Sequence, residues 1–317
     1  MNFKILTLLA EGEYSSGSEL GDKLGVSRAA VWKYVKQLQA QGIPIVSHKG
    51  KGYCWEGGGD LLDAGTICHQ SGHAASLLEV FAEVESTNKI ALGGVLEGRA
   101  SGYACFAELQ TGGRGRRGRV WSSPLAQNLY FSTIFRVSGG VQALQGLSLV
   151  VGISLAETIN TKFDVRCQVK WPNDLIVSGK KLGGILVELA GDASGDCAAV
   201  IGIGINCNMA TGSEEIDQPW TSLVNELDGT ISRNDLAADI MTSLPVDLQH
   251  FSQFGFESFI DRWNDLDVLS GRQVVVGAPS QLQSGTALGV DELGGLRVQT
   301  SLGAKVFYGG EVSVRLS

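Results

Sequence analysis

The stretch that decides the fold is residues 103–135, YACFAELQTGGRGRRGRVWSSPLAQNLYFSTIF, in which two apolar runs enclose a loop of four arginines and three glycines. The runs at residues 103–109 and 128–135 have the apolar content of buried strands. The loop, residues 113–119, is cationic in a chain of formal net charge -8, and residues 109–156 contain no Asp or Glu. Arginines that repel one another predict a segment that is disordered until an anion binds and orders it.

The loop glycines also satisfy the pattern G-x-G-x-x-G, which is typical of dinucleotide sites. Such a site needs a helix that opens at the loop and an acidic residue about 20 positions further on. Here Pro124 follows, and no carboxylate occurs before Glu157. No Gly-Lys-Ser/Thr follows the glycines, so a P-loop is excluded as well. A solvated basic loop is the remaining alternative, which the two flanking strands disfavour.

Length and composition indicate a compact globular protein. The chain has 317 residues, 44% of them hydrophobic and 18% charged, which is enough for two or three domains. None of the six cysteines forms a C-x-x-C pair, so we expect reduced core residues and neither disulfides nor a zinc site. The first residues carry a short apolar run followed directly by charges, which fits neither a signal peptide nor a membrane span. We therefore expect a cytoplasmic protein.

Composition divides the chain into three parts and predicts an α+β protein of three domains. Residues 1–60 are helical and then hairpin-like, with a glycine-rich linker at residues 56–63. Residues 61–268 alternate strands and helices, and residues 269–317 contain only short strands with glycine-rich turns, as in a small barrel.

The first part has the pattern of a winged helix-turn-helix. Ser16 and Glu19 form a capping box for a short helix that Gly25 ends, and Ser27 caps a third helix with a buried stripe at Val31 and Val35. Helix, three-residue turn and helix is the arrangement of DNA readers. Residues 43–55 then read as two strands around a Gly-Lys-Gly turn, which predicts a wing.

The charge of this part indicates a nucleic-acid partner. From Asp22 to Trp55 there are six Lys or Arg residues and a single Asp, in an otherwise acidic chain. A small helical domain for protein contacts is the alternative. DNA readers of this type usually bind as dimers. The predicted DNA-binding residues are Ser27, Arg28, Trp32, Lys33, Lys36, Lys49 and Lys51.

Polar residues stand out at several points of the middle part. Ser86, Thr87 and Asn88 follow an apolar strand, where they either cap a helix or face a polar small molecule, and Gln110 has the same ambiguity. Residues 170–174, KWPND, crowd polar side chains at a proline bend. Of the two lysines that open residues 180–188, we expect one to face solvent and the other not to. The glycines of residues 200–208 allow a ligand to approach a buried strand closely.

Together these segments resemble biotin protein ligases. The segments that carry the resemblance are STN at 86–88, Q-x-x-GRGRRGR-x-W at 110–121, KWPND at 170–174, KKLGGILVE at 180–188 and GIGIN at 202–206. They occur in the family order, and the winged helix-turn-helix in front is similar to that of bifunctional ligases that also repress biotin operons. Lipoate ligases share the core fold but lack the arginine-glycine loop.

The resemblance implies a fold and a function. The fold is a central mixed α/β ligase domain of the biotin/lipoate ligase type, followed by an SH3-like β-barrel that contacts ATP or the acceptor or is only stabilising. The function is Mg²⁺- and ATP-dependent activation of biotin to biotinyl-5'-AMP, then transfer to a lysine of a biotin carboxyl carrier protein. Biotinyl-AMP is then also the corepressor of a homodimer that binds operator DNA. A biotin-sensing repressor without significant ligase activity is the alternative.

The resemblance also implies roles for individual residues. The catalytic residues are Lys181, Arg116 and Asp174, and Asp174 is also the candidate Mg²⁺ ligand. The biotin-binding residues are Ser86, Thr87, Asn88, Gln110, Arg114, Gly115, Arg116, Lys181 and Gly184. The ATP-binding residues are Arg116, Arg119, Trp121, Lys170, Asn173, Lys181 and Asn206.

Overall fold

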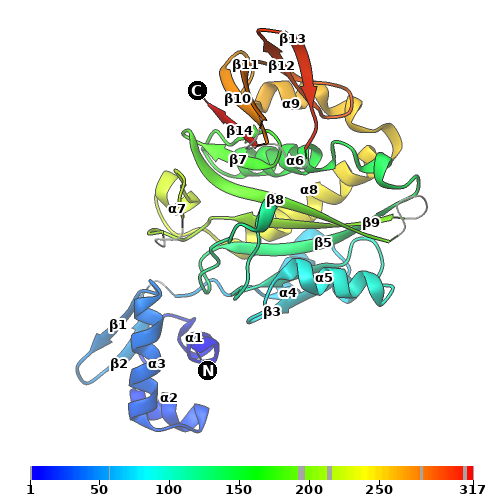
Figure 1. Ribbon diagram of the computed structural model, residues 1–317. Coiled ribbons are helices and arrows are strands. Elements are labelled where there is room, and N and C mark those ends of the chain that lie inside the picture. The colour runs from blue at the N-terminus through cyan, green and yellow to red at the C-terminus, as the bar shows by residue number, and fades with distance from the viewer. Residues whose placement is uncertain are drawn as a thin grey trace.

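The computed structural model of the protein describes residues 2–56, 58–191, 197–212, 216–278, 281–309 and 313–316. Its strands form three separate sheets of two, seven and five strands. Figure 1 shows these sheets following one another from the N-terminal end of the molecule to the C-terminal end. The predicted α+β fold is therefore confirmed.

The N-terminal part contains α1 (Asn2–Leu9), α2 (Gly17–Leu24), α3 (Arg28–Ala40), β1 (Ile45–His48) and β2 (Gly52–Trp55). The capping box of Ser16 and Glu19 is present, and Gly25 ends α2 in the left-handed conformation with φ 68°. The Ser27 hydroxyl accepts a hydrogen bond from the Ala30 amide at the start of α3. Strands β1 and β2 pair as an antiparallel hairpin, so the predicted helix-turn-helix and wing are confirmed.

The core of this part reaches beyond its own helices. Leu125 and Ala126, which follow the basic loop in sequence, are buried in the same apolar cluster as Val31, Val35 and Leu38 of α3. The Gln127 side-chain amide donates to the Gln41 carbonyl at the end of α3, at 2.7 Å. The N-terminal part is therefore packed directly against the segment that leaves the basic loop.

A buried ion pair fixes the linker that follows. Arg233 and Glu108 are both fully buried, and their side chains lie 2.7 Å apart. Arg233 also donates to the Asp60 carbonyl, and Glu108 accepts from the Leu62 amide. Removing one partner of such a pair leaves a buried charge uncompensated and costs about 3–5 kcal/mol. The pair therefore holds the linker to the central sheet.

The central sheet has the order β3-β4-β5-β9-β8-β7-β6, and only β3 and β4 are parallel. Its strands are β3 (Leu78–Phe81), β4 (Ala104–Ala107), β5 (Leu129–Val137), β6 (Gln168–Lys170), β7 (Asp174–Val177), β8 (Lys180–Gly191) and β9 (Cys197–Ile205). The longest, β5, β8 and β9, are adjacent, and every residue of β9 is buried.

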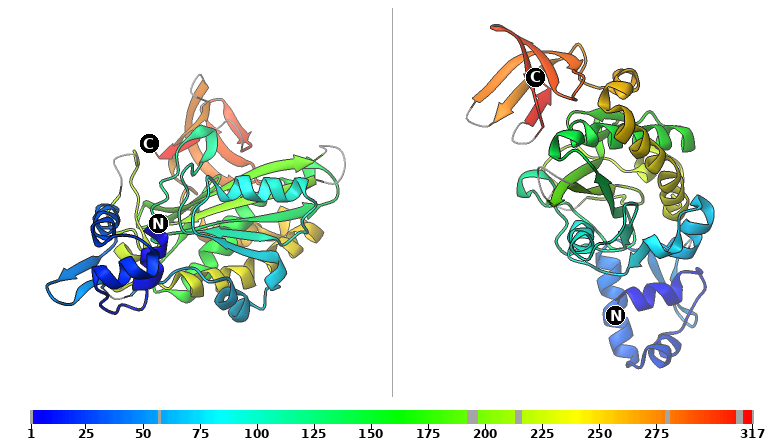
Figure 2. Two further views of the ribbon diagram at one scale, coloured as in Figure 1. Left: turned by 90° about the horizontal axis from the view of Figure 1, so that it is seen from below. Right: turned by 90° about the vertical axis from the view of Figure 1, so that its right-hand side faces the viewer.

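Helices cover both faces of this sheet. The right-hand view of Figure 2 shows the long helices α6 (Leu147–Lys162) and α8 (Arg233–Phe254) together on one side, with α5 (Thr87–Leu96) on the other. The larger core lies under the long helices, and a smaller one lies under α5. The remaining helices are α4 (Ala64–Ser71), α7 (Leu223–Glu226), α9 (Ile260–Leu266) and the 3-10 turns Ala75–Leu77, Arg116–Gly118, Val141–Leu144 and Phe256–Phe259.

One segment has the length and composition of a membrane span. It is Val141–Lys162, which includes α6, and 67% of its most apolar window is buried inside the protein. A core helix of a globular protein accounts for that pattern. All six cysteines are free and buried, as predicted.

The C-terminal part is an antiparallel sheet of order β13-β12-β11-β10-β14. Its strands are β10 (Gln273–Ala278), β11 (Gln281–Val290), β12 (Leu296–Thr300), β13 (Gly303–Phe307) and β14 (Ser313–Leu316). The expected barrel is thus seen as a sheet whose edge strands β13 and β14 do not pair with each other in the described ranges. The Trp171 indole donates to the Gly294 carbonyl at 3.0 Å, so the KWPND bend is also a contact with this sheet.

Candidate active site

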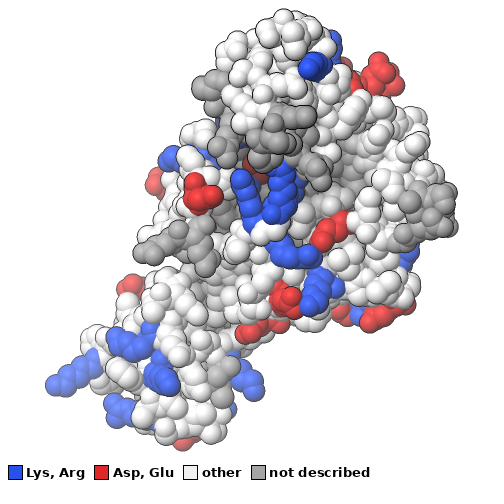
Figure 3. Space-filling model, in the orientation of Figure 1, with Lys and Arg blue, Asp and Glu red and all other residues white. Residues whose placement is uncertain are grey.

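A cavity of about 580 Å³ brings the predicted polar segments together. This volume is within the range of roughly 300–1,000 Å³ that is typical of small-molecule sites. The predicted residues that line it are Ser86, Thr87, Asn88, Gln110, Arg114, Gly115, Arg116, Arg119, Trp121, Lys170, Asn173, Asp174, Lys181 and Gly184. Figure 3 shows lysine and arginine side chains gathered in the middle of this face. Of the predicted ligand residues of the central domain, Asn206 alone lies elsewhere, in a neighbouring cavity.

Hydrogen bonds between buried groups hold the STN segment. Ser86 occupies the N-cap position of α5, but its hydroxyl makes no capping bond, so helix capping does not account for this side chain. The Gln110 amide oxygen accepts from the Thr87 backbone at 2.9 Å. Ser132 of β5, which is fully buried, donates to the Asn88 amide oxygen at 2.6 Å. Ser132 was not among the predicted site residues, because a serine within an apolar strand does not show which group it faces.

Asn88 lies flat against the sheet because β9 has a glycine beneath it. A Cβ at Gly202 would be 2.0 Å from the Asn88 amide oxygen, which no side chain tolerates. The Asn88 amide nitrogen donates to the Leu186 carbonyl at 3.3 Å and to the Glu188 carboxylate at 2.7 Å. Both of its donors are therefore used by the protein, and only the oxygen has spare capacity for a ligand.

The basic loop is described as a folded turn, and its disorder in the absence of an anion stays a prediction. The Gly115 amide donates to the Arg119 carbonyl at 2.7 Å, and the Trp121 amide donates to the Gly113 carbonyl at 2.9 Å. Oxygen atoms of other segments accept hydrogen bonds from two of the loop arginines. Arg116 donates to the Asn173 amide oxygen at 3.2 Å, and Arg114 pairs with Glu188 at 3.0 Å. These partners offset the mutual repulsion that the sequence suggested.

Arg116 is the most enclosed cation of the loop. Burial lowers the pKa of its guanidinium, the nearby Arg117 charge lowers it further, and Asp174 acts in the opposite direction. A cation that is partly desolvated next to another cation gains more from an arriving anion than one in water. The geometry therefore favours a phosphate or carboxylate beside Arg116.

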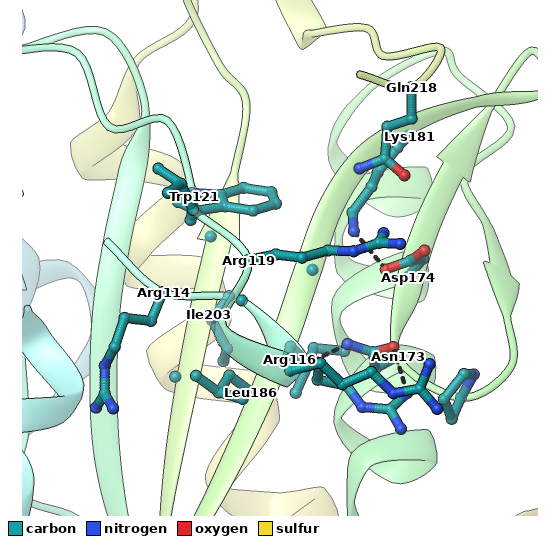
Figure 4. A pocket seen from close by; sticks show the side chains of 18 of the residues that line it. Arg114, Arg116, Arg119, Trp121, Asn173, Asp174, Lys181, Leu186, Ile203 and Gln218 are labelled. Atoms are coloured by element: carbon teal, nitrogen blue, oxygen red, sulfur yellow. Dashed lines mark hydrogen bonds and ion pairs between the residues drawn. The ribbon is translucent and has the colours of Figure 1, made fainter. Parts of the chain in front are cut away.

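Lys181 and Asp174 form an ion pair at the wall of the cavity. Their charged atoms lie 2.7 Å apart, and the side chains are 17% and 21% exposed. Lys180, by contrast, is exposed, so the prediction of one outward and one inward lysine is confirmed. Figure 4 shows Lys181, Asp174 and Arg119 converging from three different segments.

Trp121 separates the main cavity from a second cavity of about 280 Å³. Its ring rests on Gly204, where a Cβ would be 2.5 Å from the indole. The Lys181 ammonium lies 5.5 Å from the ring centroid. The indole nitrogen is buried and has no partner among the described residues. The residues that line the second cavity are Arg119, Val120, Trp121, Ser122, Lys181, Asn206, Met209, Ile216, Asp217, Gln218 and Trp220.

Asn206 has a structural role in this second cavity. Its side-chain amide donates to the Thr221 carbonyl at 2.9 Å, and its backbone amide donates to the Leu182 carbonyl at 2.9 Å. It is buried, and it fixes the segment that carries Trp220. Trp220 was missed, although an isolated tryptophan in a polar stretch is a signal that could have found it.

Other residues that line the main cavity were not among the predicted ligand residues, although some belong to the segments that carry the resemblance. They are Arg117, Val120, Trp171, Pro172, Ile176, Gly179, Ile185, Leu186, Gly202, Ile203, Gly204, Asp217, Gln218, Pro219 and Val314. The apolar ones that belong to the central sheet are Ile176, Ile185, Leu186 and Ile203, which no local motif distinguishes from core residues. Val314 comes from the C-terminal sheet, which thus forms part of the wall.

The predicted DNA-binding residues all lie on the surface of the N-terminal part. Ser27, Arg28, Lys33 and Lys36 of the α3 region are exposed, as are Lys49 and Lys51 of the wing. Trp32 is 55% exposed, which is unusual for so large an apolar ring. Figure 3 shows lysine and arginine side chains distributed over this part of the molecule.

Comparisons with known proteins agree with this architecture. Residues 80–206 match the Biotin/lipoate A/B protein ligase family, residues 2–54 match an HTH domain, and residues 269–315 match the Biotin protein ligase C terminal domain. A Bifunctional ligase/repressor BirA from Salmonella typhimurium is 41% identical over 98% of this chain and 96% of its own length. A protein of the same name from Bacillus subtilis is 28% identical over 96% of this chain and 95% of its own length.

A solved structure extends the likeness to the fold. The biotin protein ligase from Aquifex aeolicus in complex with biotin and ATP has a TM-score of 0.67 and 30% identity, and the match covers 76% of this chain and 99% of that chain. The chain therefore belongs to the biotin protein ligase family, in the form in which a helix-turn-helix domain precedes the ligase domain.

Proposed function

We propose that this protein uses ATP to activate biotin as biotinyl-5'-AMP and transfers the biotinyl group to a lysine of a biotin carboxyl carrier protein. We propose further that it represses biotin synthesis genes. The observation that carries the ligase proposal is the position of Lys181, 2.7 Å from Asp174, in one cavity with the STN segment and the basic loop. The relatives are bifunctional ligase/repressors over nearly the whole chain, which supports both activities.

The cavity offers biotin two kinds of contact. Ser86, Thr87 and Gln110 supply hydroxyl and amide groups for a polar head, whereas Leu186 and Ile203 supply an apolar wall for rings and methylenes. The carboxylate would then extend toward Lys181 and Arg116. A ligand that is polar at one end, apolar in the middle and anionic at the other end fits this order of groups.

The first step would form a bond between a biotin carboxylate oxygen and the α-phosphorus of ATP. The bond to pyrophosphate breaks, and pyrophosphate leaves with the electron pair. Charge accumulates on the phosphate oxygens, where Lys181 and the guanidinium of Arg116 can stabilise it. The biotin carboxylate acts as the nucleophile itself, so no covalent enzyme intermediate is required.

In the second step the amine of the carrier lysine would attack the acyl carbon, and AMP leaves with the electron pair of the broken acyl–oxygen bond. The amine must lose a proton. Asp174 is the carboxylate beside the reacting groups and can orient the amine and accept this proton.

The second cavity suits the adenine. Trp121 and Trp220 are flat rings, and the buried indole nitrogen of Trp121 is a donor for a heterocycle. Among the described residues no group of three metal-ligating side chains exists, but Mg²⁺ needs only one or two carboxylates when substrate phosphates and water complete its shell. Asp174 is suited to supply such a carboxylate. The metal ion would neutralise phosphate charge when bound.

The N-terminal part would bind operator DNA. The exposed cations of α3 and the wing would neutralise phosphates, with α3 in the major groove. We propose a cytoplasmic protein with functional divisions at residues 1–60, 61–268 and 269–317 that forms a homodimer when biotinyl-AMP is bound. Sedimentation with and without biotinyl-AMP tests the dimer, and an identical monomer–dimer equilibrium in both samples would reject it.

One incubation separates the two activities. The protein is mixed with biotin, ATP, Mg²⁺ and a carrier domain, and the mass of the carrier is measured. We expect the mass increment of one biotinyl group. No increment would leave a binding-only repressor, whereas biotinylation without operator binding in a gel-shift assay would reduce the N-terminal part to a scaffold.

A further inference from the structure

One carboxylate connects the basic loop to the STN segment. The Oε2 atom of Glu188, on β8, accepts from Nη2 of Arg114 at 3.0 Å and from Nδ2 of Asn88 at 2.7 Å. Arg114 belongs to the loop and Asn88 to the first turn of α5, so three elements meet at a single oxygen. Figure 4 shows the Arg114 side chain directed away from Arg116 and Asn173.

The charge distribution of the chain explains why this partner matters. Residues 109–156 contain no carboxylate, so the loop arginines depend on acidic groups from elsewhere in the fold. Glu85 also lies close enough to Arg114 for the guanidinium to contribute to lowering its pKa. Glu85, however, is paired with Lys89 at 2.6 Å and is 62% exposed, whereas Glu188 is 26% exposed. Glu188 is therefore the better shielded partner.

We propose that Glu188 is a positioning residue that latches the basic loop to the STN segment. By this arrangement one carboxylate sets both the closed position of the loop and the orientation of the Asn88 amide. Arg114 then acts through Glu188 and does not bind the ligand anion itself. The proposal rests on the proposed function for its ligand, biotin, but the latch itself concerns only contacts within the chain.

Trypsin reports the latch directly, because it cleaves after the arginines of the loop. Glu188→Gln keeps an oxygen acceptor for Asn88 but removes the charge that holds Arg114. Loss of an exposed ion pair of this kind raises the population of the open loop only a few-fold. We therefore expect cleavage within residues 113–119 to become about 2- to 5-fold faster. Glu85→Gln is the matched control and should be cleaved at the wild-type rate. An unchanged thermal midpoint for Glu188→Gln would locate the effect in the loop.

A double-mutant cycle on biotin affinity tests the role of Arg114. Calorimetric titration with biotin alone compares the wild type, Arg114→Gln, Glu188→Gln and the double variant. If Arg114 acts through Glu188, each single variant weakens biotin binding about 2- to 5-fold. The double variant then binds biotin no more weakly than the single variant with the lower affinity. Fully additive losses, or wild-type cleavage of Glu188→Gln, would overturn the latch. Failure of the wild type to bind biotin would reject the proposed function and leave the cleavage result intact.

Discussion

The Nζ atom of Lys181 lies 2.7 Å from the Oδ1 atom of Asp174, across the antiparallel pair β7 and β8. The register of these strands shifts between Leu175 and Ile176 of β7, next to the contact. A Cβ at Gly184 would be 3.5 Å from the ammonium, which is an ordinary van der Waals contact, so the position of the lysine does not depend on a glycine there. The two charges are thus held at the cavity wall by backbone geometry.

Lys181→Ala should abolish pyrophosphate exchange that depends on biotin. The ammonium is the cation placed to stabilise charge on the reacting phosphate, and loss of one such group costs roughly 100- to 1,000-fold in rate. Exchange of labelled pyrophosphate into ATP measures the first step alone. Lys180→Ala is the matched control, because Lys180 is adjacent and exposed. Activity of Lys181→Ala near the wild-type level would remove Lys181 from the mechanism.

Arg116→Ala should release biotinyl-AMP into solution. The guanidinium bridges the loop to Asn173 at 3.2 Å, so its loss opens the cover of the cavity and removes a cation beside the phosphate. Chromatography of the filtrate after incubation with biotin and ATP measures free intermediate. Arg297→Ala, at an exposed arginine of β12, is the control for loss of a positive charge. Intermediate that stays bound to Arg116→Ala would argue against closure by this residue.

The N-terminal part was predictable because its signals are local. The capping residues Ser16 and Ser27, the helix-ending Gly25 and the hairpin around the wing each act within a few residues. That one of the two lysines at 180 and 181 faces solvent and the other does not was predictable for the same reason. The ligand segments were predicted from their resemblance to a family and not from local physical signals. The structure brings all of the predicted ligand residues except Asn206 to one cavity.

The supporting groups could not be predicted, because each acts across the sheet. Ser132 and Glu188 belong to strands, where the sequence alone does not distinguish them from core or surface residues. Their contacts with Asn88 exist only because β5 and β8 lie beside α5 in the fold. Trp121 needs Gly204, which is 83 positions further along the chain, directly beneath its ring. The ordered state of the basic loop likewise depends on acceptors that are distant in sequence.

Gly202→Ala should weaken biotin binding, and Gly204→Ala should weaken ATP binding. The added methyl group would be 2.0 Å from the Asn88 amide in the first case and 2.5 Å from the Trp121 ring in the second. Overpacking of this kind costs about 1–3 kcal/mol. Calorimetric titration with each ligand measures the two effects. Gly152→Ala in α6, where the methyl group finds ordinary contacts at 3.5 Å, is the control. Equal effects of both variants on both ligands would contradict the assignment of Gly202 to the biotin site and Gly204 to the ATP site.

Lys33→Ala should weaken operator binding with a smaller dependence on salt. Lys33 is exposed on α3 in the predicted major-groove position, and each phosphate contact contributes about 1 to the slope of log K against log salt. Binding measured by fluorescence anisotropy at several salt concentrations gives this slope. Lys4→Ala, an exposed lysine of α1, should leave it unchanged. A wild-type slope for Lys33→Ala would place the residue away from the DNA.

Asp267→Asn should stabilise the protein at neutral pH and much less so in acid. Burial raises the pKa of Asp267 to about 6, and one of its carboxylate oxygens has no partner among the described residues. The folded state therefore holds the proton more tightly than the unfolded state, so the contribution of Asp267 to stability is greatest in acid and is lost as pH rises from about 4 to 6.

The asparagine substitution imitates the protonated form and still offers an oxygen to the Leu269 amide, which now donates to Asp267 at 2.8 Å. We expect the gain in unfolding free energy at pH 7.5 to exceed the gain at pH 4.5 by on the order of 2 kcal/mol, because one unit of pKa corresponds to about 1.4 kcal/mol. Urea titrations at both pH values measure it. Asp261→Asn, an exposed carboxylate of α9, should show no such difference. A gain that does not vary with pH would mean that the carboxyl group is not the source of the stability change.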